Sequence, residues 1–121
     1  MSRLRVGIDL VQISRIAGSL EAFGERFLRR IFTDAEIAYA RAAPARRAER
    51  LAARFAAKEA AKKALELDGV SWRDLEVERA DSGACTLVLH GAASTAASGR
   101  ALALSMSHEG DHATAVVIAY E

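Results

Sequence analysis

Residues 46–67 read RRAERLAARFAAKEAAKKALEL. Nearly every position in this stretch is Ala, Leu, Arg, Lys or Glu; the stretch contains no Gly or Pro, and Gly69 follows it. These residue types have high intrinsic helix propensities, and a glycine commonly follows the C-terminus of a helix. The sequence therefore predicts one long helix over residues 46–67, the longest element of the chain.

Two shorter helical regions are predicted on the N-terminal side of this helix. The segment Thr33-Asp34-Ala35-Glu36 has the pattern of a capping box, in which the Thr and Glu side chains each accept a backbone amide of the first turn. The helix that begins there should end before Pro44, because the residue before a proline avoids helical geometry. Upstream, apolar residues recur with a helical period over residues 14–32, and breaks are expected at Gly18 and Gly24.

Strands are predicted mainly after the long helix. One almost unbroken apolar run near the N-terminus predicts a buried strand, and four later runs are also typical of strands. A short Ala- and Ser-rich helix is expected over residues 92–97, and the last two strands are joined by a loop at 108–112. The five predicted strands cover residues 4–11, 71–80, 86–90, 101–107 and 113–120.

The order of these elements predicts the fold class and the domain organisation. Helices come early and strands late, which is typical of an α+β fold with an antiparallel sheet packed against the long helix and the shorter ones. A chain of 121 residues, 51% of them apolar, fits a single domain over residues 1–121. No apolar run approaches the roughly 20 residues that span a bilayer, and the N-terminus lacks a signal-peptide pattern. With its single Cys85, the chain is expected to be cytoplasmic, with no disulfide framework and no membrane contact.

The net charge of +1 hides an asymmetry between the two halves of the chain. Residues 1–63 carry 14 Arg and Lys against 7 Asp and Glu, whereas residues 64–121 carry 3 Arg against 9 acids. The basic half is suited to meeting an anionic partner, and the excess of Arg over Lys favours phosphate or carboxylate. The alternative is that the two halves neutralise each other within the fold or across an oligomer.

Asp9 is the first candidate for a functional residue. It stands inside the apolar run of the first predicted strand, where a carboxylate is costly to bury unless it is paired, caps a helix or binds a metal ion. A structural role as a helix N-cap at the strand-to-helix junction is the alternative. Gly7, two residues earlier, allows a backbone or a ligand to approach closely.

Glu59 and Lys63 form a second candidate pair, one turn apart on one face of the long helix. Arg54, Lys58 and Lys62 form another stripe at the same spacing. An ordinary surface ion pair would explain Glu59 and Lys63. The functional interpretation is a carboxylate that binds a metal ion beside an ammonium group, because Mg²⁺ in proteins takes one or two carboxylates and completes its shell with phosphate oxygens and water. Asp9 and Glu59 together would provide such a pair.

His108 is the third candidate, in the segment Ser105-Met106-Ser107-His108-Glu109 at the end of a predicted strand. A histidine there can donate a hydrogen bond to a phosphate oxygen or stabilise a leaving group. The alternative is a structural histidine in a polar turn. Neither serine has a predicted His–Asp arrangement around it, so a hydrolase triad is not favoured.

In combination, these motifs resemble the holo-acyl-carrier-protein synthase family over essentially the whole chain. The resemblance is strongest in the long-helix block from Arg54 to Ala64, which lies at the family's distance from Asp9. The matching segments are Gly7-Ile8-Asp9-Leu10-Val11, Arg15-Ile16, Phe32-Thr33-Asp34-Ala35-Glu36, Arg54 through Ala64, and Ser105 through His108.

The resemblance implies a role for each matching residue. Asp9 and Glu59 would bind Mg²⁺, and Lys63 would act with them in catalysis and contact the reacting phosphate of coenzyme A. Other contacts to coenzyme A would come from Arg46, Arg54 and His108. The acidic carrier protein would dock on Arg15, Arg26 and Arg30. Similar enzymes are homotrimers with sites shared between subunits, so these residues need not meet within one chain.

The implied reaction is Mg²⁺-dependent transfer of the 4′-phosphopantetheine group from coenzyme A to a serine of an apo acyl carrier protein. Adenosine 3′,5′-bisphosphate is released, and Glu59 is the candidate acceptor of the serine proton, directly or through a water. The enzyme would serve fatty-acid biosynthesis or a dedicated secondary-metabolite pathway. The alternative is a non-catalytic module that binds coenzyme A or the carrier. A nucleic-acid-binding function is not favoured, because the chain has no helix-turn-helix pattern and only 6% aromatic residues.

Two segments depart from the family pattern. Gly83-Ala84-Cys85 stands where similar enzymes usually have Gly-Lys-Pro, and Leu65-Glu66-Leu67-Asp68-Gly69 replaces a Gly-rich loop. Neither segment includes a predicted metal ligand. The second is expected to change how the coenzyme A pocket closes or which carrier is accepted.

Overall fold

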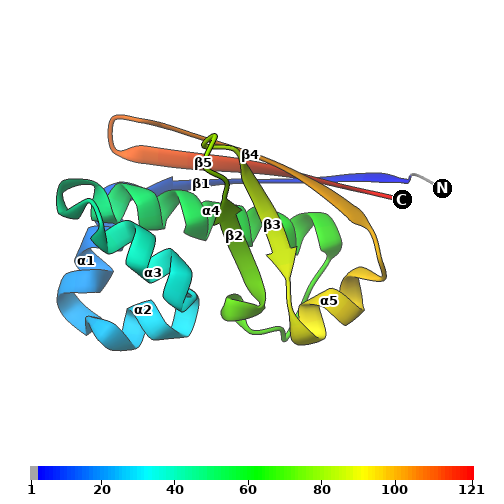
Figure 1. Cartoon of the computed structure of the whole chain (residues 1–121), viewed down its shortest axis with the longest axis horizontal. Helices are drawn as coiled ribbons and strands as arrows, with labels where there is room; N and C mark the ends of the chain where they lie inside the picture. Colours follow the sequence, from blue (N-terminus) through cyan, green and yellow to red (C-terminus); the bar gives the residue numbers. More distant parts are fainter. Residues whose placement is uncertain (1–2) are drawn as a thin grey trace.

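The computed structural model describes residues 3–121, and its longest element is the predicted long helix (Figure 1). This helix, α4 (Arg47–Leu65), has 19 residues. It follows a 3-10 turn, η1 (Pro44–Arg46), and ends where Glu66 takes a left-handed backbone conformation with φ of 53°. The predicted helix is therefore confirmed, although it starts one residue later and ends two residues earlier than expected.

Three helices precede α4: α1 (Ile13–Phe23), α2 (Glu25–Ile31) and α3 (Asp34–Arg41). The break between α1 and α2 falls at Gly24, whose positive φ of 53° is accessible to glycine at little cost. The break expected at Gly18 is wrong, because this exposed glycine lies inside α1, where it costs only about 1 kcal/mol relative to alanine. The capping box at the start of α3 is confirmed, with both reciprocal hydrogen bonds present.

The strands form two antiparallel sheets, where the sequence predicted one. The larger sheet has the order β1-β5-β4. Its central strand is the last of the chain, β5 (His112–Tyr120), which pairs with β1 (Leu4–Gln12) on one side and with β4 (Ala101–Glu109) on the other. The smaller sheet is the hairpin of β2 (Leu75–Arg79) and β3 (Cys85–Leu89). A 3-10 turn, η2 (Trp72–Asp74), occupies the region predicted as the start of β2, and α5 (Gly91–Ala97) follows β3.

The last hairpin is tighter than predicted. The loop expected over residues 108–112 is wrong, because Glu109 pairs with His112 and only Gly110 and Asp111 form the turn. A two-residue turn keeps the pairing of β4 and β5 continuous to the end of both strands. His108 therefore lies on a strand, paired with Ala113, and not in a polar turn.

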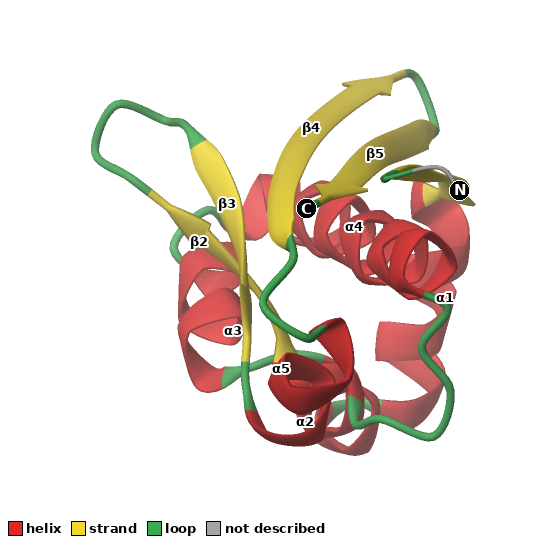
Figure 2. Ribbon diagram, turned by 90° about the vertical axis from the view of Figure 1, so that its right-hand side faces the viewer, coloured by secondary structure: helices red, strands yellow, loops and turns green. Residues whose placement is uncertain are grey.

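The larger sheet lies over α4, and α2 and α5 lie on the far side of that helix (Figures 1 and 2). Alanine makes this close packing possible, because the small side chains along α4 are buried and let the backbones approach. The closest approach is at Gly7 of β1, where an added Cβ would lie 1.9 Å from the carbonyl oxygen of Ala60. Gly7 is therefore required for β1 to lie against α4, as the sequence suggested for a close approach of backbone.

The opposite face of the larger sheet is apolar and exposed. Along β1, the residues Val6, Ile8 and Leu10 are 66%, 63% and 67% exposed. Large apolar side chains that line up on one face in this way are typical of a surface that is covered in an assembly. Within residues 3–121, no helix has the length and apolar character needed to cross a membrane.

Candidate active site

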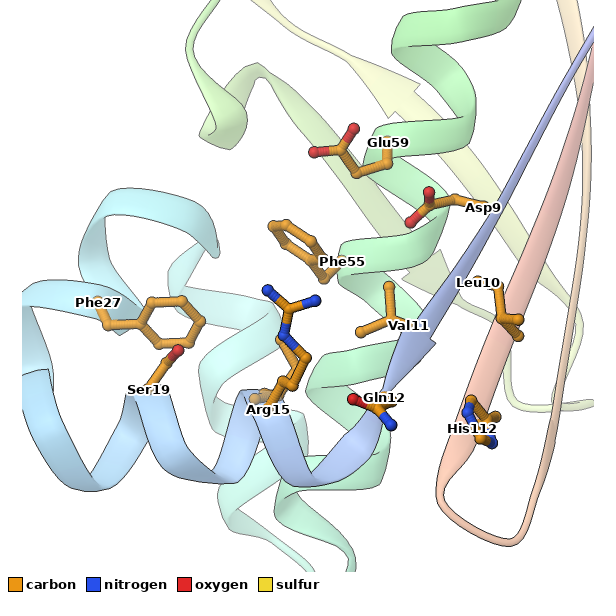
Figure 3. Close-up of a pocket in the computed structure, with 11 residues that line it drawn as sticks. Asp9, Leu10, Val11, Gln12, Arg15, Ser19, Phe27, Phe55, Glu59 and His112 are labelled. Atoms are coloured by element: carbon orange, nitrogen blue, oxygen red, sulfur yellow. The ribbon is translucent and has the colours of Figure 1, made fainter.

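A cavity of about 490 Å³ lies where α1, β1 and α4 meet (Figure 3). Its rim carries both carboxylates that the sequence predicted as metal ligands, Asp9 from β1 and Glu59 from α4. Arg15 of α1 reaches into the same cavity, beside the apolar rings of Phe27 and Phe55. The structure therefore brings together three predicted residues that are up to 50 positions apart in the sequence.

The position of Asp9 follows from the pleat of β1. Alternate residues of a strand point to opposite faces, so Ile8 and Leu10 face outward while Asp9 faces α4. Its side chain is 18% exposed and lies 3.2 Å from the Nζ of Lys63. The helix-cap alternative for Asp9 is wrong, because α1 begins at Ile13 with Gln12 at the N-cap position.

Lys63 joins the strand and the helix at this site. Its Nζ donates to the Asp9 carboxylate at 3.2 Å and to the carbonyl oxygen of Ile8 at 2.9 Å. The alternative of an ordinary Glu59–Lys63 surface pair is wrong, because Lys63 pairs with Asp9. Within residues 3–121, Glu59 has no hydrogen-bond or ion-pair partner, which leaves its carboxylate available to a ligand.

The donor set at this cavity fits Mg²⁺. Two carboxylates from different elements line one cavity; Lys63 holds that of Asp9, and that of Glu59 has no partner among the described residues. Among the described residues, no group of three or more His, Cys, Asp or Glu side chains is arranged to hold a metal ion by itself. A site with only two protein carboxylates suits Mg²⁺ in the presence of a phosphate substrate, because that ion completes its shell with phosphate oxygens and water.

A second cavity, of about 240 Å³, gathers the other predicted coenzyme A residues. Arg46 at the end of η1, Arg54 of α4 and His108 of β4 all line it. His108 lies 3.2 Å from the carboxylate of Glu49, which also lines the cavity. The two cavities have no lining residue in common, so the predicted site is divided into a carboxylate cluster and an arginine cluster within one chain.

Arg54 is the most unusual member of the arginine cluster. It is only 4% exposed, and its buried Nε has no hydrogen-bond partner in the part of the chain that the structure describes. Burial lowers the pKa of Arg54, although nearby Cys85 and Tyr39 oppose this effect. A buried guanidinium with an unsatisfied N–H on the wall of a cavity is suited to binding an anion.

Sequence reasoning missed several residues of the arginine cavity. Arg50 lies one helical turn before Arg54, so its place on the same face of α4 could have been recognised from spacing alone. Arg79 and Cys85 reach the cavity only because β2 pairs with β3 in the register that sets them opposite each other. Tyr39 of α3 also lines the cavity, and no motif in the surrounding sequence indicated this role.

The predicted carrier-docking residues lie on two helices. Arg15 is on α1 and lines the carboxylate cavity, whereas Arg26 and Arg30 are exposed on α2. Neither Arg26 nor Arg30 has an ion-pair partner within residues 3–121. Phe23, at the end of α1, is 65% exposed and adds an apolar contact point close to these cations in sequence.

Comparison with known proteins places this arrangement in a family. Residues 5–117 match the model of the 4′-phosphopantetheinyl transferase superfamily. The chain is 50% identical to a holo-acyl-carrier-protein synthase of Koribacter versatilis, over 95% of this chain and 96% of the relative. It is similar in structure to the Chronobacterium ammoniagenes enzyme in a complex with coenzyme A, with a TM-score of 0.87, 33% identity and coverage of 98% of both chains. The Helicobacter pylori holo-acyl-carrier-protein synthase in complex with coenzyme A matches with a TM-score of 0.84 and 29% identity, over 94% of this chain and 98% of that one. The chain therefore belongs to the 4′-phosphopantetheinyl transferase superfamily and, within it, to the holo-acyl-carrier-protein synthases.

Proposed function

We propose that the chain transfers the 4′-phosphopantetheine group of coenzyme A to a serine of an apo acyl carrier protein, and that the transfer requires Mg²⁺. The observation that carries this proposal is the meeting of Asp9, Glu59 and Lys63 at the junction of β1 and α4, beside a cavity. A module that only binds coenzyme A would not require two carboxylates next to a phosphate-binding ammonium, because carboxylates repel the diphosphate unless a cation lies between them.

The residues of the carboxylate cluster have distinct roles in the reaction. The serine Oγ of the carrier forms a bond to the β-phosphorus of coenzyme A, and the bond from that phosphorus to the bridging oxygen breaks, which releases adenosine 3′,5′-bisphosphate. Glu59, whose carboxylate has no partner within residues 3–121, accepts the serine proton, and Lys63 donates hydrogen bonds to the transferring phosphoryl group. Asp9 and Glu59 would hold Mg²⁺, which when bound supplies neutralisation of the diphosphate charge.

The nucleotide end of coenzyme A binds the arginine cluster in this proposal. Arg46, Arg54 and His108 line one cavity there, and the buried Arg54 Nε has no hydrogen-bond partner among residues 3–121. Guanidinium groups bind phosphate through paired N–H donors, and such charge-assisted hydrogen bonds are stronger than neutral ones. Glu49 lies 3.2 Å from the Nδ1 of His108 in the same cavity.

The separation of the two clusters supports a site shared between subunits of a homotrimer. The carboxylate and arginine cavities have no common lining residue, so one coenzyme A molecule would use the former from one subunit and the latter from its neighbour. The exposed apolar face of the larger sheet, including Val6, Ile8 and Leu10, is the surface that would be covered when three chains assemble.

Complementation between two inactive variants tests the shared site. Asp9→Asn disables the carboxylate face, and Arg46→Glu disables the arginine face at an exposed position. Each variant alone should be inactive, whereas trimers formed by co-expression should recover up to about a quarter of wild-type activity. This fraction follows because in a ring of random composition one site in four receives both intact faces. The readout is the mass gain of an apo carrier.

The matched control is a mixture of Asp9→Asn with Glu59→Gln, which both disable the same face. This mixture should stay inactive, because every subunit lacks either Asp9 or Glu59 and no site receives both carboxylates. Recovery in the control, or no recovery in the test mixture despite a trimeric mass in light scattering, would contradict a site shared in this way.

Carrier docking is assigned to Arg15, Arg26 and Arg30, as the sequence suggested. Arg26 and Arg30 are exposed and lack ion-pair partners among the described residues, so both remain available to an acidic surface. Arg15 reaches the carboxylate cavity, which would place the docked carrier next to the site where its serine reacts. Complementary charges of this kind steer association more than they add affinity.

The setting of the enzyme is also part of the proposal. Residues 1–121 act as one transferase domain in the cytoplasm, of which residues 1 and 2 lie outside the described part. Fatty-acid biosynthesis or a dedicated secondary-metabolite pathway would supply the carrier protein.

A further inference from the structure

The arginine cavity carries more positive charge than the predicted residues account for. Four arginines line it, together with His108 and a single carboxylate, Glu49, which lies against His108. Among the described residues, none of these arginines has a carboxylate partner. The four are Arg46, Arg50, Arg54 and Arg79. Such a concentration of guanidinium groups whose charges no neighbouring carboxylate neutralises indicates a ligand group with more than one negative charge.

Three of these guanidinium groups are arranged around one aromatic ring. The ring centroid of Tyr39 lies 3.9 Å from the guanidinium carbon of Arg50 and 4.3 Å from that of Arg54. Arg79 approaches the same ring at 5.6 Å from β2. Cation–π contacts of this kind hold the flat faces of the guanidinium groups. Arg50 and Arg54 each donate an N–H group to a backbone carbonyl oxygen, that of Tyr39 at 2.7 Å and that of Arg50 at 3.3 Å. Among the described residues, the side chain of Arg79 has no hydrogen-bond partner, so its N–H groups are available to a ligand.

Arg79 has this position because the neighbouring turn has no side chain in its way. A Cβ added to Gly83 would lie 3.4 Å from a terminal nitrogen of Arg79, and Gly83 has a φ of 93° that suits glycine. The guanidinium of Arg79 therefore lies over the β2–β3 turn, on the wall of the cavity formed by the hairpin. It lines the same cavity as Arg50 and Arg54 of α4.

We propose that Arg79, held against Tyr39, determines specificity for the 3′-phosphate of coenzyme A; this inference rests on the proposed transferase function. The nucleotide end of coenzyme A carries a diphosphate and a 3′-phosphomonoester. The diphosphate must reach Asp9 and Glu59, which line the other cavity, so the phosphomonoester is the group left for the arginine cluster.

Activity with two donors tests the proposal. The wild-type enzyme should prefer coenzyme A to 3′-dephospho-coenzyme A, and Arg79→Gln should reduce this preference by about tenfold, the factor that corresponds to roughly 1.4 kcal/mol of lost phosphate contact. Arg79→Lys should restore part of the preference, because it keeps the charge but loses the paired donors and the stacking. Arg100→Gln, which removes an arginine outside the cavity, is the matched control and should leave the preference unchanged. Equal losses for both donors in Arg79→Gln would overturn the proposal.

Cys85 provides a binding measurement that does not depend on turnover. It is the single cysteine of the chain and lines the arginine cavity. Adenosine 3′,5′-bisphosphate should slow alkylation of Cys85 by iodoacetamide at lower concentration than AMP does, and Arg79→Gln should remove this difference. If the wild type transfers no group but this difference is present and depends on Arg79, the proposed function fails and the 3′-phosphate assignment stands. If Arg79→Gln is protected as well as the wild type, the assignment fails whatever the activity.

Discussion

Glu59→Gln removes transfer to the carrier almost completely, lowering turnover by roughly 10²–10³-fold or more, the range observed when a group that stabilises transition-state charge is lost. Two of its functions disappear together, because the amide can neither accept the serine proton nor bind Mg²⁺ as a carboxylate does. Asp9→Asn should have an effect of similar size, since it removes the second carboxylate charge and with it the ion pair with Lys63. Turnover is measured as the rate of mass gain of an apo carrier at saturating coenzyme A.

Folding controls separate this loss from misfolding. Glu59 is half-buried and without a partner among the described residues, so its amide variant should unfold within a few degrees of the wild type. Glu66→Gln is the matched control, because it changes a carboxylate that is 69% exposed just beyond the end of α4. Wild-type turnover by well-folded Glu59→Gln and Asp9→Asn would contradict the metal assignment.

Lys58→Met should destabilise the folded protein by about 3–5 kcal/mol, because it leaves the buried carboxylate of Glu36 without its countercharge. Both side chains are fully buried, and the Lys58 Nζ lies 2.8 Å from a carboxylate oxygen of Glu36. Lys58 also donates to the carbonyl oxygens of Trp72 and Leu75, so it ties α4 to the start of β2. Urea unfolding followed by circular dichroism measures the loss.

A second substitution, at Glu36, tests whether the loss of stability in Lys58→Met arises from the unpaired charge. Glu36 accepts hydrogen bonds from the backbone amides of Thr33 and Val77, each at 2.9 Å but at different carboxylate oxygens, so glutamine can accept only one of them through its single carbonyl oxygen. The double variant Lys58→Met with Glu36→Gln should therefore recover part of the stability lost in Lys58→Met alone, because it removes the unpaired buried charge but leaves one backbone amide without an acceptor. A double variant that is less stable than either single one would show that the pair does not act as a charge pair.

The burial of Lys58 could not be predicted from the sequence. Its spacing with Arg54 and Lys62 predicted a basic stripe along the long helix. Burial lowers the pKa of Lys58, with Glu36 opposing this effect, and Lys62 lies 4.0 Å from the ring centroid of Trp72. The stripe therefore packs against other elements, and no feature of spacing distinguishes that outcome from exposure to solvent.

Local signals in the sequence predicted the helices well because their determinants lie within a few residues. The Thr33–Glu36 capping box and the boundary at Pro44 involve only neighbouring side chains and backbone groups, and both are confirmed. The pairing of β1 with β5 and the division into two sheets depend on contacts between distant segments, and local sequence patterns do not indicate which segments meet.

The sequence predicted part of the candidate site and missed the contacts that depend on tertiary structure. Asp9 and Glu59 could be found from their residue types and from the family motif, and the structure confirms that they line one cavity. The Asp9–Lys63 pair was missed because it depends on the close approach of Gly7 to α4. Arg79 was missed because its place follows from the strand register of the β2–β3 hairpin.

The most direct test of the transferase activity and of its metal requirement is intact-mass spectrometry of apo acyl carrier proteins incubated with this protein and coenzyme A. Carriers of fatty-acid, polyketide and peptide synthesis should be tried in parallel, with Mg²⁺ and with EDTA. We expect at least one carrier to gain the mass of one phosphopantetheinyl group with Mg²⁺, and to gain nothing with EDTA. An equal gain in EDTA would contradict the Mg²⁺ site at Asp9 and Glu59, and no gain on any carrier would contradict the transferase itself.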